Sequence, residues 1–449
     1  MKQRGLSILV ILVMLLLLAG CGGQPTPAPT AAPADTEAEP AEAAAEPTEE
    51  MAEAAAEPTE EMAEAAAPAS DAPAAIEVGA VVPLTGPFAG GGAQVERGYN
   101  MAVEAINANG GVYVKAYDAQ IPLHLNLLDD ESDPSKTVSH METLYSDSDI
   151  VAYLGGFGSS LHAAAAAIAE KNQVPYLGVA FALWQVHQQG YKYLFSPFIK
   201  SPDIAVGTFE FLDATLPEGE RPIRVGIFQE QTDWGIELGQ LWRDNAEAAG
   251  YEVVVYEEYA PGSQDFTDLI LKAKEADVQL LLALPNPPDG LTIYKQMGEL
   301  DYTPNASFFI RAPDVPTWSE SLGTAGDDVM LAPGWHNSVQ FPGVDELNAK
   351  HVELMGRPAD PIVGPAYAAV QILANAIEQA GTLDRAAIRD AIAASDVDTV
   401  AGHMTFNEDG TGKVPFVLLQ YQSGKPELIW PQEFAKVDFI YPAPPFSER

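Results

Sequence analysis

The sequence predicts an α/β protein whose body consists of two lobes, each built on a doubly wound parallel sheet. From residue 76 onward, apolar strand-like runs alternate with segments of helical periodicity. This alternation is typical of parallel sheets that are covered by helices on both faces. The strand-like runs are also too numerous for one sheet of ordinary width, so two lobes are expected. The cleft between two such lobes is the expected binding site.

The elements follow one another regularly along the body. The first strand-like run covers residues 76–82, and a helix is predicted over residues 93–107. A turn at residues 407–410 precedes a predicted hairpin strand at residues 415–421. The other strand-like runs, with helical periodicity between most neighbours, are residues 123–128, 150–154, 175–179, 224–228, 252–256, 278–284 and 307–310.

The chain begins with an export signal. Lys2 and Arg4 precede an apolar run over residues 6–18, which is shorter than the roughly 20 residues that span a bilayer. The small residues before Cys21 resemble the lipobox of bacterial lipoproteins. We therefore predict that residues 1–20 are a removed signal peptide and that Cys21 carries the lipid. The alternative is an uncleaved anchor helix that happens to contain a cysteine.

A tether is predicted between the lipid and the body, over residues 21–75. Residues 22–75 contain no Lys, Arg, aromatic, Leu, Ile or Val, so they cannot build a core. The eleven residues from 41 to 51 recur unchanged from 52 to 62, and Pro47 and Pro58 interrupt the helical tendency of the Ala and Glu residues. A disordered, extended Ala/Glu/Pro-rich spacer is expected.

Composition limits what the body can be. Cys21 is the only cysteine, so an exported protein of this kind must be held together by core burial rather than by disulfides. Of the formal charge of −41, the first 21 residues contribute +2 and residues 22–75 contribute −13, which leaves −30 for the body. A chain this acidic repels phosphate backbones, so no nucleic acid partner is expected.

The segment from Gly155 to Ser160 is a candidate anion site. It follows a strand-like run and precedes a predicted helix over residues 161–170. The free N–H groups of the first helical turn, together with the hydroxyl of Ser159 or Ser160, can hold a carboxylate. The alternative is a plain N-cap on a structural helix.

Other motifs carry no catalytic or cofactor chemistry. The glycine-rich turn at residues 85–92 has the wrong spacing for a dinucleotide fingerprint and is predicted to let a ligand or an opposing backbone approach closely. The acidic run at residues 129–133 lacks the pattern of a calcium loop and is expected to be a solvated strand end. The histidines have no paired metal spacing, and no nucleophile elbow is present. We therefore expect no enzyme activity, no cofactor and no metal.

Trp234 is the most suggestive aromatic residue. It lies where a strand passes into a helix of the second lobe. In such folds this position faces the cleft, where the indole can stack on a ligand; packing between the lobes is the alternative.

Several segments resemble the leucine/isoleucine/valine-binding protein family. Residues 79–87 followed by residues 105–112 look like the family's opening. The acidic segment at residues 129–134 and the stretches at residues 364–371 and 406–410 continue the likeness in the family's order.

This resemblance implies a type I periplasmic-binding fold, with a hinge of three crossover segments near residues 197, 335 and 406. The first lobe would comprise residues 76–197 and 335–405. The second lobe would comprise residues 198–334 and 406–449.

The resemblance also implies a function. The protein would be a monomeric extracytoplasmic solute-binding lipoprotein, anchored to the membrane, that closes its lobes on a branched-chain or other apolar amino acid. It would deliver this solute to an ABC permease and its ATPases. Two alternatives remain open: a binder of an amide, urea or aromatic carboxylate, and a component of a ligand-sensing receptor that takes no part in transport.

The resemblance assigns the site residues position by position. Ser159 matches the serine that holds the ligand carboxylate, and an acidic residue near Asp314 is expected to receive the ligand ammonium. Ala182 stands where amino-acid binders usually have a threonine, and Gly91 where many have a bulky aromatic residue. The complete predicted site consists of Phe157, Gly158, Ser159, Ser160, Ala180, Phe181, Ala182, Trp234, Asn286 and Asp314.

Overall fold

The computed structural model describes residues 72–449, which belong to one compact unit that runs from Ala67 to Arg449. The predicted signal peptide, Cys21 and nearly all of the predicted tether lie outside the described residues. Among residues 72–449, no helix combines the length and apolar character needed to cross a membrane.

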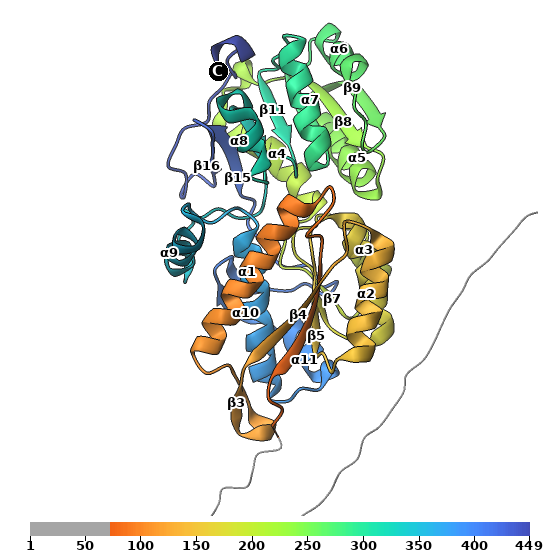
Figure 1. The fold of residues 1–449 in the computed structure, drawn as a ribbon. Coiled ribbons are helices and arrows are strands. Elements are labelled where there is room, and N and C mark those ends of the chain that lie inside the picture. The colour runs from red at the N-terminus through yellow and green to blue at the C-terminus, as the bar shows by residue number, and fades with distance from the viewer. Residues whose placement is uncertain (1–71) are drawn as a thin grey trace, which may run out of the picture. The chain divides into compact units, whose positions relative to one another are not determined.

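The first lobe is built on a parallel sheet of five strands in the order β4-β1-β5-β6-β7 (Figure 1). The longest pairing joins β1 to the edge strand β4, in register from Ile76 opposite Leu123 to Val82 opposite Asp129. The strands are β1 (Ile76–Val82), β4 (Leu123–Asp129), β5 (Ala152–Leu154), β6 (Tyr176–Leu177) and β7 (Leu194–Phe195). The helices of this lobe are α1 (Ala89–Ala108), α2 (Pro134–Asp147), α3 (Ser159–Asn172), α10 (Val363–Ala380) and α11 (Arg385–Ala393).

The second lobe is built on a sheet of seven strands in the order β16-β15-β12-β11-β10-β8-β9. Its strands are β8 (Arg224–Glu230), β9 (Glu252–Tyr259), β10 (Leu280–Leu284), β11 (Ala306–Phe309), β12 (Val329–Leu331), β15 (Leu418–Gln422) and β16 (Lys425–Trp430). Its helices are α4 (Ser201–Thr215), α5 (Asp233–Ala248), α6 (Thr267–Glu275), α7 (Pro287–Glu299) and α8 (Thr317–Leu322). The doubly wound α/β fold class predicted from the alternating pattern is therefore confirmed.

One feature of the second sheet differs from the prediction. The sheet is not wholly parallel, because β15 runs antiparallel to β12 and pairs with β16 as a hairpin. The predicted hairpin strand at 415–421 corresponds to β15, which begins at Leu418. A two-stranded hairpin needs only a short turn, whereas a further parallel strand needs a crossover helix, so the chain ends its sheet in the shorter way.

The short elements were not recognised in the sequence. They include two small antiparallel ribbons, β2 (Val112–Val114) with β3 (Ala119–Ile121) and β13 (Asp396–Thr399) with β14 (Gly402–Thr405). Helix α9 (Val344–Met355) lies on the connection between β12 and α10. Strands of three or four residues carry too few side chains to establish a period, so the apolar pattern does not find them.

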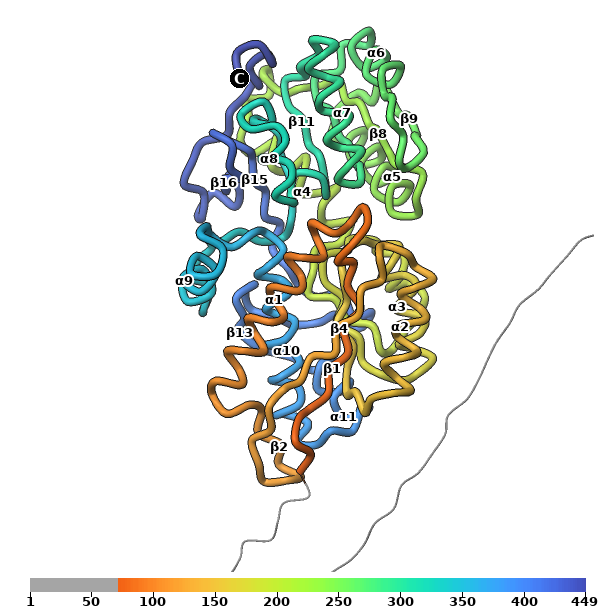
Figure 2. The backbone as a smooth tube through the Cα atoms, viewed as in Figure 1, coloured from red at the N-terminus to blue at the C-terminus, as the bar shows by residue number. Residues whose placement is uncertain are grey.

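The chain passes between the two sheets three times, after β7, after β12 and after β14 (Figure 2). The positions predicted for the hinge, near residues 197, 335 and 406, fall within these connections. The first and third connections are joined at Ser196, whose N–H donates to the carbonyl of Gly410 at 2.9 Å and whose carbonyl accepts from the N–H of Gly412 at 2.9 Å.

The glycine-rich turn before α1 is shorter than predicted. Helix α1 begins at Ala89 rather than at residue 93, so Gly90, Gly91 and Gly92 form its first turn. A side chain at Gly91 would collide with the ring of Phe157, and one at Gly92 would collide with the carbonyl of Pro83. The glycines therefore allow an opposing backbone to approach closely, as predicted. They do so from the first turn of a helix and not from a loop.

The acidic run after β4 was predicted to be a solvated strand end. This prediction is wrong for Asp130. Asp130 is fully buried, and its carboxylate accepts hydrogen bonds from the hydroxyl of Thr137 and the N–H of Ser132. Asp129 accepts from the N–H groups of Leu84 and Glu131. These carboxylates tie the loop after β1 to the loop after β4.

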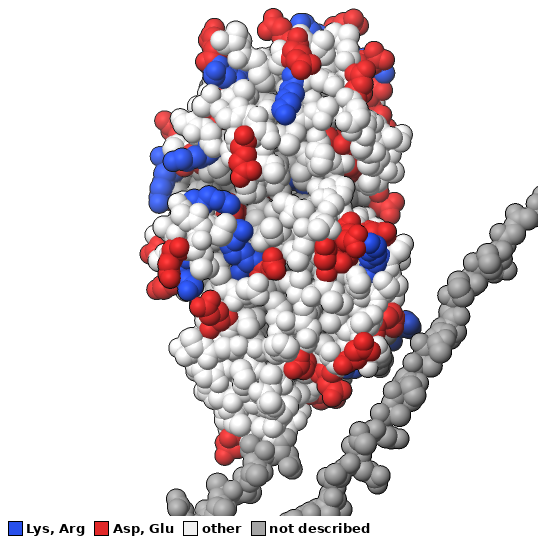
Figure 3. Space-filling model, viewed as in Figure 1, with Lys and Arg blue, Asp and Glu red and all other residues white. Residues whose placement is uncertain are grey.

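Acidic side chains are spread over both lobes on the face shown in Figure 3, whereas Lys and Arg gather mainly beside α9. This face therefore has no broad basic surface of the kind that binds phosphate backbones.

Helices α1 and α10 of the first lobe pack against each other unusually closely. A Cβ atom at Gly98 of α1 would lie 2.6 Å from the Cβ of Ala366 and 2.6 Å from the carbonyl oxygen of Val363. The backbone carbonyl cannot move aside as a flexible side chain would. The two helices therefore approach each other only because residue 98 has no side chain.

We expect Gly98→Ala to lower the free energy of unfolding by about 1 to 3 kcal/mol through overpacking. Intrinsic helix propensity alone would favour alanine by about 1 kcal/mol, so the sign of the change separates the two effects. Asn100→Ala, at an exposed position of the same helix, is the control. A raised thermal midpoint for Gly98→Ala would contradict this account of the packing.

Candidate functional site

The carboxyl ends of strands from both sheets border one cavity of about 410 Å³. Loops after β1, β4, β5 and β6 supply its wall on the first lobe, and the ends of β8, β9, β10 and β11 with the segments that follow them supply the wall on the second. The first-lobe residues are Pro87, Phe88, Ser132, Ser159, Ser160 and Leu183. Those of the second lobe include Glu230, Trp234, Asn286, Asp289 and Arg311.

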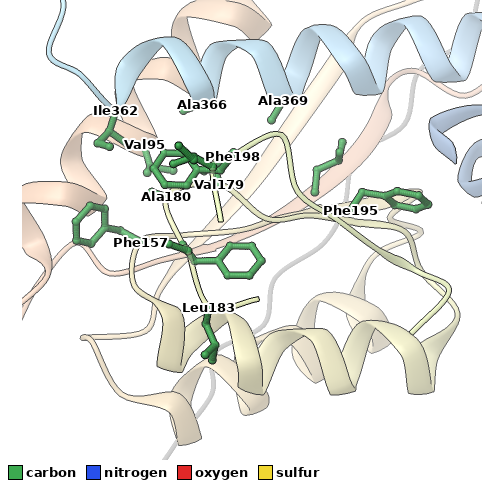
Figure 4. Packing of buried hydrophobic residues seen from close by; sticks show 14 of the residues in the cluster. Val95, Phe157, Val179, Ala180, Leu183, Phe195, Phe198, Ile362, Ala366 and Ala369 are labelled. Carbon is green, nitrogen blue, oxygen red and sulfur yellow. The ribbon is translucent and has the colours of Figure 1, made fainter. Parts of the chain in front are cut away.

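A second cavity, of only about 30 Å³, adjoins the first and shares Ser159, Trp234 and Arg311 with it. This small cavity has mostly apolar walls, formed by Phe157, Ala180, Phe181, Ala182, Phe198 and Ile362. Figure 4 shows four of them, Phe157, Ala180, Phe198 and Ile362, within the packed apolar cluster of this region. The polar side chains that line this cavity include Ser159, Arg311 and Asp314.

All ten residues of the predicted site line one or both of these cavities. Ser160 and Asn286 line the larger cavity, and Ser159 and Trp234 line both. Six others line the smaller cavity: Phe157, Gly158, Ala180, Phe181, Ala182 and Asp314. The structure therefore brings the whole predicted set together at the facing ends of the two sheets.

The start of α3 presents unpaired donors to the cleft. Gly158 is the N-cap, with φ of +103°, and no side chain caps the helix. Ser159 is 5% exposed, and its hydroxyl has no hydrogen-bond partner among residues 72–449. A helix N-terminus with unused N–H groups and a free hydroxyl suits a carboxylate.

The loop after β6 has its carbonyl groups tied away from the cleft. The carbonyl of Ala180 accepts from the N–H of Gly158 at 3.1 Å, and that of Phe181 accepts from Nζ of Lys200 at 2.7 Å. The carbonyl of Ala182 accepts from both the N–H and the hydroxyl of Ser201. The N–H groups of these three loop residues have no partner within residues 72–449. They form a second set of donors beside Ser159.

Asp314 is a buried carboxyl group without a counterion. It is 8% exposed, and its Oδ1 has no hydrogen-bond partner in the described part of the chain. Burial raises the pKa of Asp314 to about 8, and the charge of Arg311 offsets only part of this effect. Its backbone carbonyl accepts from Nε2 of Gln94 at 2.8 Å, which holds the segment against the first lobe. A cationic group of a ligand would satisfy this carboxylate.

The wall of the second lobe contains a buried ion pair that was not predicted. Nη2 of Arg311 donates to Oε2 of Glu230 at 2.6 Å, and the two side chains are 8% and 3% exposed. Nδ2 of Asn286 donates to Oε1 of Glu230 at 3.0 Å and to Oδ2 of Asp289 at 2.7 Å. The available signal was a charged residue within two positions of the end of each apolar run, Glu230 after 224–228 and Arg311 after 307–310.

The guanidinium of Arg311 lies between aromatic rings of the two lobes. It is 4.8 Å from the ring centroid of Trp234 and 5.3 Å from that of Phe88. The backbone of Arg311 has φ of +77°, a conformation that residues other than glycine rarely adopt and that clusters at functional sites. Its Nη1 has no hydrogen-bond partner within residues 72–449, so the two N–H groups of this atom remain available.

Trp234 is both a wall residue of the cleft and a packed side chain. It lines both cavities, and its Nε1 donates to the hydroxyl of Ser201 at 3.2 Å. One edge of the indole is therefore fixed by packing while the side chain still forms part of the wall. No group of three His, Cys, Asp or Glu side chains within the described residues could hold a metal ion.

The chain is similar to known proteins over most of its length. The model of the family described as periplasmic binding protein matches residues 75–426. A Leu/Ile/Val-binding protein homolog of Brucella abortus is 23% identical over 384 residues, which cover 82% of this chain and 94% of that protein. A leucine-, isoleucine-, valine-, threonine- and alanine-binding protein of Pseudomonas aeruginosa is 27% identical over 345 residues, covering 75% and 86%.

Solved structures share the fold. A leucine-binding protein, LivK, from Thermotoga maritima superposes with a TM-score of 0.71 at 20% identity, covering 80% of this chain and 99% of that one. The branched-chain amino acid binding protein LivJ of Streptococcus pneumoniae, solved with isoleucine, gives 0.69 at 20% identity, covering 79% and 99%. With the family model spanning most of its length, and as its sequence motifs predicted, the chain belongs to the periplasmic binding protein family.

Proposed function

We propose that this protein is the extracytoplasmic solute-binding component of an ABC importer and that it captures an amino acid with a branched-chain or other apolar side chain. The observation that carries the proposal is the pairing, in one small cavity, of carboxylate-binding donors on the first lobe with the free carboxyl of Asp314 on the second. An α-amino acid carries its carboxylate and ammonium on the same carbon. It therefore complements both walls at once.

This division of contacts supports capture by lobe closure. The ligand carboxylate would bind Ser159 and the amides of Ala180–Ala182, and the ammonium would bind Asp314 from the opposite lobe. A ligand shifts an equilibrium only by its difference in affinity for the two states. Contacts to both lobes are complete only when the cleft is shut, so binding would stabilise the closed state.

The apolar walls support the side-chain class. Phe88, Phe157 and Trp234 border the space beyond the two polar groups, and the rings of Phe88 and Phe157 lie 6.1 Å apart. The names of the related proteins from Brucella and Pseudomonas both refer to leucine, isoleucine and valine, and the name of the Pseudomonas protein adds threonine and alanine. Burial of an aliphatic side chain contributes about 1.5 to 3 kcal/mol.

A second candidate ligand class is a carboxamide or urea. The pair of Arg311 and Glu230 presents an N–H donor and a carboxylate acceptor side by side in the larger cavity. An amide or urea presents a C=O group beside an N–H group, which is the complementary pattern.

The amino-terminal region supports membrane attachment. We propose that Cys21 is lipidated after removal of residues 1–20 and that the following Ala/Glu/Pro-rich segment is a tether. The basic start, the apolar run and the single cysteine are the supporting features. The partners would be the membrane, the permease and its ATPases.

The ligand proposal is tested by calorimetric titration of protein that has been unfolded and refolded to remove carried-over solute. We expect leucine, isoleucine or valine to bind most tightly among a panel that adds phenylalanine, glutamate, urea, short amides and benzoate. Leucinamide lacks the carboxylate and isocaproate lacks the ammonium, so both should bind weakly. Binding of amides or aromatic acids alone would reject the amino acid proposal.

Ser159→Ala should weaken binding of the same ligand by about 1 to 3 kcal/mol, because a buried hydrogen bond to a charged group is lost. Ser139→Ala, at an exposed position on α2, is the control and should leave affinity unchanged. Equal affinities for Ser159→Ala and the natural protein would remove Ser159 from the site.

Asp314 should make both stability and affinity depend on pH. Its folded pKa is raised to about 8 from an ordinary value of 3.8, so the folded state holds a proton that the unfolded state releases. Its contribution to stability is therefore present at low pH and lost as pH rises toward about 8. Affinity for an ammonium ligand should change in the opposite sense, tightening by up to about tenfold per pH unit between pH 6 and 8 as the carboxyl ionises.

The test compares Asp314→Asn with Asp345→Asn, an exposed carboxyl on α9. Asp314→Asn should bind amino acids weakly at every pH and lose the stability decline between pH 6 and 8. If its profiles match those of Asp345→Asn, then Asp314 is not the ammonium receptor.

Cys21→Ser should release the protein from the membrane fraction and abolish metabolic labelling with palmitate. Solute binding should be unchanged, because the substitution lies far from the body in sequence. Continued palmitate labelling of the variant would contradict the assignment of Cys21.

A further inference from the structure

The wall segment of residues 180–185, which we call the ligand loop, belongs to the first lobe but is held by side chains of the second. It connects β6 to β7 in the first sheet. Two polar side chains that contact it from α4 and α5 are buried, namely Lys200 at 3% exposure and Glu237 at 6%. Neither residue was singled out in the sequence, and neither is needed to bind the ligand directly.

Lys200 binds the loop from the first connection between the lobes. Its Nζ donates to the carbonyl of Phe181 at 2.7 Å and to the hydroxyl of Ser196 at 2.7 Å, and it lies 3.4 Å from the centroid of the Phe181 ring. It is also the N-cap residue of α4. Movement of α4 is therefore transmitted directly to the backbone of Phe181.

Glu237 binds the other end of the loop from α5. Its Oε1 accepts from the N–H of Trp184 at 2.8 Å, and its Oε2 accepts from the N–H of Gln185 at 2.7 Å. Both carboxylate oxygens are thus used on consecutive loop residues. Helix α5 packs on β8 and β9, so this contact again joins the loop to the second lobe.

Ser201 and Trp234 complete the connection at the centre of the loop. The hydroxyl of Ser201 donates to the carbonyl of Ala182 at 2.9 Å and accepts from Nε1 of Trp234 at 3.2 Å. A single chain of hydrogen bonds therefore links Trp234 in the cavity wall, Ser201 at the start of α4 and Ala182 in the ligand loop.

These buried groups cost stability. Neither Lys200 nor Glu237 forms a salt bridge with another residue of the described chain, and removal of a charged group from water costs several kcal/mol unless it is compensated. Burial lowers the pKa of Lys200 well below its ordinary value, and the neighbouring charges of Glu237, Asp203 and Asp409 oppose this only in part. Apolar residues would fill the same space at lower cost.

We infer that Lys200 and Glu237 are positioning residues that fix the ligand loop against the second lobe, so that its free N–H groups meet the ligand carboxylate as the lobes close. The inference rests on the proposed function only in that the loop faces the ligand. Each side chain acts through the loop backbone and not through contact with the solute.

The test uses Lys200→Met and Glu237→Gln in the full-length protein. Methionine keeps much of the length of lysine without its amine, and glutamine keeps the shape of glutamate while turning one acceptor into a donor that faces a loop N–H group. Lys272→Met and Glu257→Gln remove the members of an exposed ion pair on the same lobe and serve as matched controls.

Three quantities are measured for each variant: affinity for the solute that the natural protein binds best, hydrogen exchange of residues 180–187, and the thermal midpoint. We expect about tenfold weaker binding and faster loop exchange in Lys200→Met and Glu237→Gln, with an unchanged or raised midpoint for Lys200→Met. A merely structural role would lower the midpoint together with affinity.

Unchanged affinity or unchanged loop exchange in both variants would overturn the positioning role while the proposed function stands. Parallel loss of midpoint and affinity in Lys200→Met would overturn it as well, in favour of a structural role. If the natural protein binds no solute of the panel, the proposed function fails and the positioning role fails with it.

Discussion

The structure depends on one constraint, which is that parallel strands in two separate sheets end at the same cleft. Each strand end is followed by a loop or a helix N-terminus, so the backbone donors and short polar side chains of both lobes collect there. Residues as distant in sequence as Ser159, Trp234 and Asp314 line one small cavity for this reason. The chain crosses between the sheets three times, so each wall belongs to a lobe with its own sheet while remaining joined to the other.

Burial makes the pairing of each charged group in the cleft matter. Asp314 is buried without a counterion, whereas Arg311 and Glu230 neutralise each other at 2.6 Å. In such surroundings an unpaired charge costs far more than it would in water. The site therefore gives up stability in the free protein, and a ligand with complementary charges restores it. The buried side chains of Lys200 and Glu237 likewise lower the stability of the free protein while they hold the ligand loop in place.

The fold was predictable because it follows from local pattern, whereas most of the candidate site residues came from the resemblance to a family. Alternating apolar runs and helices indicated two parallel sheets, and the glycine-rich strand-to-helix turn at residues 155–160 indicated a group of free N–H donors. Arg311 and Glu230 were missed because a single charged residue after a strand looks like an ordinary solvated end. Asp130 was also taken for a solvated residue. Only the tertiary fold packs Thr137 of α2 and the loop after β4 around its carboxylate.

The sequence by itself determined the single cysteine and the acidic balance, which are matters of composition, and the family, which depends on motifs in a certain order. Tertiary structure alone decided which polar groups are buried and which of them meet. Ser159 and Asp314 are separated by more than 150 residues, and nothing in either neighbourhood specifies the other. Their proximity and the raised pKa of Asp314 arise only when two sheets face each other and exclude water from the space between them.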